Sequence, residues 1–262
     1  MNQGDLLSQG ARSRVYRRGS SDVVKVFDKG ISQEEIEREA TGARIAREAG
    51  LPVPVVRDVI EIQGSPAIVY ERVPGQPMDE YVAENPGIMQ ELATRMAQLH
   101  QEVHKIKAPG GLPKVREELE QRIRRLEALS EPLKEHALKT LETLPDGDVL
   151  LHCDLHPQNI LVDDDSELHL IGWSNISSGH PWADVMRSYL IIHLSRTSLP
   201  RNMLWLPEGF KTFYLETYLN NDDDLVPGVM EWMPAVAVAR MGEGFAQEQA
   251  EIRKVVGGQS QF

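Results

Sequence analysis

The residues best suited to chemistry in this chain are a histidine, an aspartate and an asparagine on one short segment. His152 and Asp154 follow an apolar run, and Asn159 stands five positions after the aspartate, directly before a second apolar run. This spacing predicts a loop between two strands that carries a carboxylate and a carboxamide. Transfer of a phosphoryl group from ATP needs such a pair. The aspartate orients the acceptor hydroxyl or accepts its proton, and the asparagine holds magnesium.

A structural role is the alternative for these side chains. Asp154 could cap backbone N–H groups of the loop, and Asn159 could make a turn. His152 is expected to order the loop through hydrogen bonds, whereas His156 could either support the loop or contact a substrate. Asp154 and Asn159 are interpreted together, because each acquires a catalytic meaning only beside the other.

Position 172 departs from what this chemistry requires. An enzyme of this type carries a second metal-binding aspartate at the end of the next strand, which is expected at 168–171. The residue that follows is Gly172, which has no side chain and cannot ligate a metal. Oxygens of Ser174, Asn175 or the acidic triplet 163–165 could compensate, although the triplet is more simply a polar turn between two strands.

Lys25 lies in the middle of a β-branched, apolar run at 22–27. A lysine in a buried strand needs a counter-charge or a phosphate, and an ordinary edge-strand lysine is the alternative. The helix expected at 33–49 begins with a capping box at Ser32. Of its glutamates, Glu39 is the expected partner of Lys25, because it shares one helix face with apolar positions.

The surrounding elements divide the chain into a sheet-rich part and a helical part. Strands are expected within 6–17, around a small-residue turn, and at 22–27, 53–62 and 67–71. The cluster of proline and glycine at 73–77 is interpreted as the boundary. Helices are expected beyond it, at 88–103, 117–129, 131–144, 183–194, 201–219 and 226–256. We therefore expect an α+β, bilobal, kinase-like fold, with a small sheet-rich N-terminal lobe over 1–73 and a larger, mostly helical lobe over 74–262.

Composition limits the classes of partner. The chain has 262 residues, of which 41% are hydrophobic, enough for one large domain or two lobes around a cleft. A formal net charge of −12 argues against nucleic acid and membrane partners and would attract a cationic substrate, although solubility alone explains such a charge. The only cysteine is Cys153, so no internal disulfide exists. With no signal peptide and no membrane-spanning run in the sequence, we expect a cytoplasmic protein.

Four segments carry a resemblance to a known family. Residues 152–159 read His-Cys-Asp-Leu-His-Pro-Gln-Asn, similar to an H-G-D-x-H-P-x-N motif, and residues 171–175 are similar to an I-D-W element. Residues 179–184 resemble a G-x-P-x-x-D motif, and residues 70–75 resemble a segment that joins two lobes. In this order they resemble the aminoglycoside phosphotransferase and choline kinase-like family, which has a protein-kinase-like fold. The resemblance covers nearly the whole chain.

The resemblance implies roles for the residues already singled out. Asp154 would be the catalytic base and Asn159 the magnesium ligand. Pairing with Glu39 would direct Lys25 toward the α and β phosphates of ATP or GTP. Asp184, at the expected start of a helix, would support the catalytic loop.

Two further groups of residues would bind the nucleotide. A loop over the phosphates would offer backbone N–H groups and one hydroxyl; its residues are Gly10, Ser13 and Val15. By resemblance alone, backbone groups near the lobe boundary would contact adenine; these belong to Tyr70, Glu71 and Val73.

The implied activity is phosphoryl transfer from ATP or GTP, with Mg²⁺, to a small hydroxyl-bearing acceptor, aminoglycoside-like or an amino alcohol. Cys153 stands at a usual glycine of the family and Gly172 at its magnesium-binding aspartate. Gly172 leaves three alternatives open: an enzyme impaired by this substitution, a metal site completed by other ligands, or a non-catalytic nucleotide-binding pseudokinase or scaffold. The sequence leaves the oligomeric state open. Acidic residues of the C-terminal half could line a site for a cationic acceptor or form a solvated face; they are Asp222, Asp223, Asp224, Glu231, Glu243 and Glu248.

Overall fold

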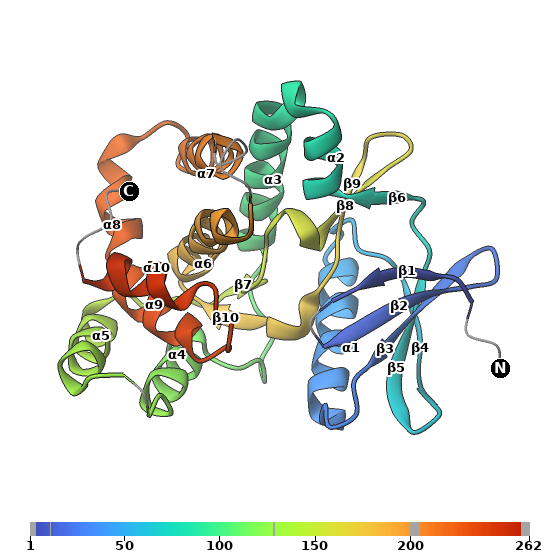
Figure 1. The fold of residues 1–262 in the computed structure, drawn as a ribbon, viewed down its shortest axis with the longest axis horizontal. Coiled ribbons are helices and arrows are strands. Elements are labelled where there is room, and N and C mark those ends of the chain that lie inside the picture. The colour runs from blue at the N-terminus through green and yellow to red at the C-terminus, as the bar shows by residue number, and fades with distance from the viewer. Residues whose placement is uncertain (1–3, 11, 128, 200–204, 258–262) are drawn as a thin grey trace. The chain divides into compact units, whose positions relative to one another are not determined.

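The computed structural model describes residues 4–257 apart from residues 11, 128 and 200–204. The chain forms two compact units (Figure 1). The first consists of residues 1–81 and 158–176, and the second of residues 82–157 and 177–262. The sheet-rich N-terminal part and the helical C-terminal part confirm the expected α+β class. The functional division into lobes at 1–73 and 74–262 stays a prediction.

The first unit is built on an antiparallel sheet of five strands in the order β1-β2-β3-β5-β4. Gln63 and Gly64 both have positive φ, 53° and 77°, as a two-residue hairpin turn requires between β4 and β5. The strand expected from residue 53 begins at residue 56. The strand bounds are Leu6–Gln9 for β1, Ser13–Arg18 for β2, Asp22–Phe27 for β3, Val56–Ile62 for β4 and Ser65–Glu71 for β5.

Helix α1, Gln33–Glu48, lies beside this sheet (Figure 1). Ser32 and Glu35 form the expected capping box, and Gly50, with φ of 91°, follows the end of the helix. Ile36 and Ala40 pack with Phe27 and Ile68 of the sheet. Since side chains alternate along a strand, Lys25 points to the same face as Phe27, toward α1.

A second, three-stranded sheet in this unit contains β6 (Gly75–Pro77), β8 (Ile160–Asp163) and β9 (Leu168–Leu170), in the order β6-β8-β9. The segment expected only to break structure therefore includes a short strand. Gly75 is needed there, because a Cβ atom would lie 2.2 Å from the carbonyl oxygen of Val162. The short helix η3, Trp173–Asn175, follows β9 and packs on α1.

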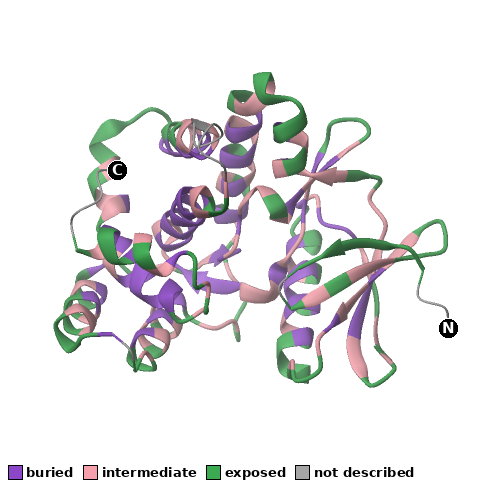
Figure 2. Cartoon of the chain, in the orientation of Figure 1, coloured by how far each residue is buried: buried purple, intermediate pink, exposed green. Residues whose placement is uncertain are grey.

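The second unit is mostly helical. Helices α6 (Pro181–Ser195) and α9 (Met233–Met241) are largely buried (Figure 2), and α6 contacts the helices α7, α8 and α9. Strands β7 (Val149–Leu151) and β10 (Ser177–Gly179) form a two-stranded sheet. The helices are α3 (Met89–His104), α4 (Val115–Arg124), α5 (Glu131–Thr143), α6 (Pro181–Ser195), α7 (Trp205–Tyr218), α8 (Val226–Met230), α9 (Met233–Met241) and α10 (Gln249–Val256), while α2 (Met78–Glu84) contains the boundary between the units.

Two helix predictions need correction. The single helix expected at 226–256 is three helices, because a proline begins α9 and Gly244, with φ of 82°, lies between α9 and α10. The helix expected at 117–129 is α4, which ends at Arg124. Residues 201–204 of another expected helix lie outside the described residues. None of the described helices is long and apolar enough to cross a membrane.

Candidate active site

Lys25, Glu39 and Tyr70 form a connected cluster in the first unit. Lys25 Nζ donates to Glu39 Oε1 at 2.6 Å, and the Tyr70 hydroxyl donates to the same oxygen at 3.0 Å. Glu39 is buried, whereas the Lys25 side chain is 21% exposed. Burial and the neighbouring Glu39 charge raise the pKa of Tyr70 well above its usual value, so its hydroxyl stays a donor. The expected pairing of Lys25 with Glu39 is present, and its role toward phosphates stays a prediction.

The ends of the β1–β2 loop are described. The Gly10 N–H donates to the Ser13 carbonyl at 2.9 Å, which closes a tight turn. Ser13 begins β2, and Val15 pairs directly with Lys25 across the sheet. The proposed phosphate-binding loop therefore runs into the strand that lies beside the lysine.

The residues expected to meet adenine lie at the end of β5. Tyr70 directs its side chain to Glu39, and the Glu71 N–H already donates to the Val55 carbonyl at 2.8 Å. Val73 follows the strand, and its N–H has no partner within the described part of the chain. Of the three backbone N–H groups, that of Val73 is consequently the one best able to donate a hydrogen bond to a nucleotide base.

Asn159 and Gly172 are close neighbours in the first unit. The Ile171 N–H donates to the Asn159 carbonyl at 3.0 Å, and a Cβ atom built on Gly172 would lie only 2.6 Å from Asn159 Oδ1. The asparagine oxygen thus lies where a side chain at 172 would begin. Mg²⁺ prefers oxygen ligands and completes its shell with waters and phosphates, so Asn159 Oδ1 fits one position of a magnesium site, to which Gly172 adds no ligand.

The acidic triplet 163–165 makes a turn. Asp163 Oδ1 accepts the N–H groups of Asp165 at 3.0 Å and Glu167 at 2.8 Å, and Asp163 Oδ2 lies 2.7 Å from His169 Nε2. The bond from His169 lowers the pKa of Asp163. The simpler interpretation of this triplet, as a polar turn between strands, is confirmed for Asp163.

The loop that carries Asp154 is in the second unit and is fixed by Asp184. Asp184 accepts the N–H of His152 at 2.6 Å and the N–H of Cys153 at 3.0 Å, through its two oxygens. His152 Nδ1 accepts the N–H of Asp154 at 3.2 Å. These bonds confirm that Asp184 supports the loop from the start of α6, and that His152 orders it.

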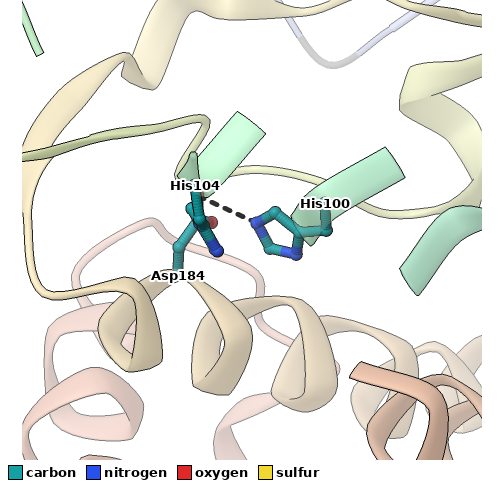
Figure 3. A group of neighbouring side chains, drawn as sticks. All are labelled: His100, His104 and Asp184. Carbon is teal, nitrogen blue, oxygen red and sulfur yellow. Dashed lines mark hydrogen bonds and ion pairs between the residues drawn. The ribbon is translucent and has the colours of Figure 1, made fainter. Parts of the chain in front are cut away.

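Two histidines of α3 hold Asp184 in turn (Figure 3). The Nε2 atom of His100 lies 3.1 Å from Asp184 Oδ2, and that of His104 lies 3.4 Å from the same oxygen. On the other side of each ring, Nδ1 of His100 lies 2.7 Å from the Tyr214 hydroxyl, and Nδ1 of His104 lies 2.7 Å from the Tyr218 hydroxyl. Burial lowers the pKa of His104 to about 4, so its imidazole is neutral near pH 7. These side chains are of types that can bind metal. Since Asp184 binds the loop N–H groups and each histidine Nδ1 lies at hydrogen-bond distance from a tyrosine hydroxyl, we interpret the group as a support for the loop.

Asp154 lies between a guanidinium and an imidazole. Arg187 Nη2 donates to Asp154 Oδ1 at 3.2 Å, and His156 Nε2 lies 3.8 Å from Asp154 Oδ2. Burial would raise the pKa of Asp154, but the neighbouring His156 and the charge of Arg187 hold it well below its usual value. Asp154 is therefore ionised at any physiological pH, and its carboxylate can accept a hydrogen bond from an acceptor hydroxyl.

Several residues around Asp154 were missed from the sequence. Arg187 is the only arginine or lysine in α6 and stands three positions after Asp184, which was the available signal. Glu243 and Glu248 were expected on a solvated face or in an acceptor site. Arg240 binds Glu243 at 2.6 Å and Glu248 at 2.8 Å, and Glu248 is buried, so a solvated face is wrong for Glu248. A role of either residue in an acceptor site stays a prediction.

A cavity of about 540 Å³ lies elsewhere in the second unit, among α6 to α10. Its lining combines apolar side chains with carboxylates, among them Leu215, Met230, Met233 and Glu216. It includes Asp222 and Asp223, two of the acidic residues expected in an acceptor site or on a solvated face, but neither Asp154 nor the residues bonded to it. We therefore assign it no part in the chemistry at Asp154.

The chain matches a family model described as the phosphotransferase enzyme family over residues 4–221. No curated protein matches it. Among solved structures, aminoglycoside phosphotransferase APH(4)-Ia with ADP and hygromycin B is 17% identical, with a TM-score of 0.69 over 100% of this chain and 95% of that one. Amicoumacin kinase hAmiN with AMP-PNP, Ca²⁺ and Ami is 18% identical, with a TM-score of 0.64 over 98% and 87%.

A third similar structure is an aminoglycoside-3'-phosphotransferase of type VIII, 21% identical, with a TM-score of 0.64 over 90% of this chain and 91% of that one. These neighbours are phosphotransferases that act on small molecules. At such identities the likeness is one of fold, and it confirms the expected protein-kinase-like architecture.

Proposed function

The chain belongs to the phosphotransferase enzyme family, and on that premise we propose that it transfers the γ-phosphoryl group of ATP or GTP to a hydroxyl group of a small molecule. The observation that carries this proposal is the state of Asp154. Its carboxylate is ionised and 22% exposed, on a loop whose backbone is bound by Asp184. An acceptor hydroxyl needs such a fixed hydrogen-bond acceptor to attack a phosphorus atom in line.

The nucleotide would bind to the first unit. Lys25, held by Glu39, supplies a fixed positive charge for the phosphates, and the Ser13 hydroxyl, at the start of β2, could add a hydrogen bond. The Val73 N–H would receive the adenine or guanine base. Asn159, five positions after Asp154 in the chain, would lie near the transferred group.

Asn159 is also the residue that would hold Mg²⁺, through Oδ1. The ion, when bound, neutralises charge that develops on the phosphates. Gly172 adds no ligand, and losing one preorganised electrostatic group typically lowers a rate by about 10²–10³. We therefore propose a slow transferase, with a nucleotide-binding protein that transfers no phosphate as the alternative favoured by Gly172.

The acceptor is proposed to be a small polyhydroxylated or amino-alcohol compound with positive charge. The net charge of −12 supports a cationic acceptor. One similar structure contains hygromycin B, and the amicoumacin kinase structure contains the compound Ami. These bound compounds support an acceptor of similar size. We place the reaction in the cytoplasm, where ATP is available and the thiol of Cys153 would stay reduced.

Phosphoryl transfer can be tested with ATP or GTP labelled at the γ position, Mg²⁺ and a panel of aminoglycosides and amino alcohols. We expect a product with one added phosphate and a rate reduced about 10²–10⁴-fold in Asp154→Asn, since the oriented acceptor is lost. Asp58→Asn, at an exposed position of β4, is the matched control and should retain the rate. Nucleotide binding without transfer to any acceptor would favour the non-catalytic alternative.

A further inference from the structure

Six charged side chains form a continuous network behind the Asp154 loop, all within the second unit. Glu243 lies at its centre and accepts hydrogen bonds from three arginines. Arg187 and Arg240 each donate to it at 2.6 Å, and Arg122 donates at 3.1 Å. These arginines come from α6, α9 and α4, so the network joins elements that are far apart in the sequence.

Glu248 and Asp154 complete the network at its two ends. Arg240 donates to both oxygens of Glu248, at 2.8 and 2.9 Å. Arg187 donates through Nη2 to Asp154 and through Nε to the carbonyl of Cys153. One guanidinium therefore fixes both the side chain of Asp154 and the backbone just before it.

Opposite charges alternate along this network. Arg187 binds the carboxylates of both Glu243 and Asp154, and the side chains of Arg187, Arg240 and Glu248 are only 7%, 8% and 10% exposed. Loss of the Asp154 charge would remove one of the carboxylates bonded to the buried guanidinium of Arg187, which is costly for a buried charge. The network therefore favours the carboxylate form of Asp154.

We propose that Arg187, anchored by Glu243 and through it by the C-terminal helices, is a positioning residue that orients Asp154 and keeps it ionised for phosphoryl transfer. This inference rests on the proposed function. It assigns a task to the C-terminal segment, since Arg240, Glu243 and Glu248 all follow residue 221, where the family match ends. Among the groups that act on Asp154 are His152 and His156 of its own loop and Arg187 of α6.

Arg187→Met is the direct test, because it removes the charge and keeps an apolar stem. We expect kcat at neutral pH to fall about 10²-fold through misorientation of Asp154, with little change in KM for the nucleotide. We also expect the acid limb in the pH profile of kcat to lie at higher pH than in the wild type, because loss of the Arg187 charge raises the pKa of Asp154. Arg187→Lys, which keeps the charge without the planar fork, should lower kcat without shifting this limb.

Glu243→Gln separates orientation from charge. It weakens the anchor of Arg187 but makes the network more positive, so we expect a lower kcat with no shift of the acid limb to higher pH. If Arg187→Met does not fold, the single variants Glu243→Gln and Arg187→Lys test the proposal in its place. Arg196→Met, at the end of the same helix and outside the network, is the matched control.

A readout without turnover distinguishes this inference from the proposed function. The carboxyl ¹³C signal of Asp154, assigned by its loss in Asp154→Asn, should titrate at higher pH in Arg187→Met than in the wild type. If no acceptor is phosphorylated but this shift occurs, the positioning inference stands and the proposed function fails. A folded Arg187→Met with wild-type kcat and an unshifted Asp154 titration would overturn the inference.

Discussion

The Asn159 side chain occupies the space that a side chain at position 172 would need, which decides how a substitution there is accommodated. Gly172 has φ of 81° and ψ of 44°, a left-handed conformation that glycine adopts freely and that aspartate and asparagine adopt more readily than other residues. A Cβ atom there would meet the end of the Asn159 side chain, which can rotate away. The backbone at 172 is therefore compatible with an aspartate at a modest cost.

Gly172→Asp should gain function and lose stability. We expect magnesium-dependent nucleotide affinity to appear or increase and turnover to rise up to about 10²-fold, because a carboxylate joins Asn159 as a ligand. Displacing Asn159 from its rotamer costs about 0.5–1.5 kcal/mol, which for a chain of this size lowers Tm by roughly 2–4 °C per kcal/mol. Calorimetry, transfer assays and thermal melts measure these effects.

Gly172→Ala is the matched control for this substitution. It introduces the same Cβ atom without a carboxylate, so Tm should fall and magnesium dependence should not improve. Equal nucleotide affinity and turnover in the two variants would show that position 172 does not limit the metal site.

At the scale of elements, local patterns predicted the parts that position the nucleotide-binding residues. The apolar run around Lys25 and the helix face that Glu39 shares with apolar positions predicted this pair, and the two side chains are bonded. The C-terminal helices were predicted less well, since 226–256 has a continuous helical pattern whose breaks at α9 and α10 depend on proline and glycine positions. Pairing between helices depends on their orientation, which periodicity does not give, so the contact of α3 with the start of α6 was not predicted.

That contact between α3 and α6 should make stability depend on pH. The native pKa of His104 is lowered to about 4, whereas the unfolded value is about 6.5. Between these values the unfolded chain binds the extra proton, so the free energy of unfolding should fall as pH decreases from 6.5 to 4, by at most about 1.4 kcal/mol per pH unit from this group. Its neighbours in the cluster are His100, Asp184 and Tyr218.

Denaturant unfolding between pH 7.5 and 4.5 measures this slope. His104→Gln should flatten it, because glutamine does not titrate, whereas His136→Gln, on the exposed side of α5, should leave it unchanged. An identical slope in His104→Gln and the wild type would contradict a neutral, buried His104.

At the scale of the whole molecule, the order of the motifs along the chain predicted the fold class. The ion pairs between residues far apart in the sequence were not predicted. Asp154, Asn159 and Asp184 lie in segments that local patterns mark. Arg187 and Glu243 are separated by 56 residues and meet only in the folded chain, so no local pattern could join them. The acidic net charge likewise did not indicate that Glu243 and Glu248 are neutralised by buried arginines.

Calorimetric titration with ATP and GTP, with and without Mg²⁺, tests the central claim most directly, because it requires no knowledge of the acceptor. We expect one nucleotide to bind with an affinity that increases with Mg²⁺ and falls about 10- to 100-fold in Lys25→Met, which loses a charged hydrogen-bond donor. Lys29→Met, at an exposed position nearby, should bind as the wild type does. Failure of both nucleotides to bind, or wild-type affinity in Lys25→Met, would contradict the account.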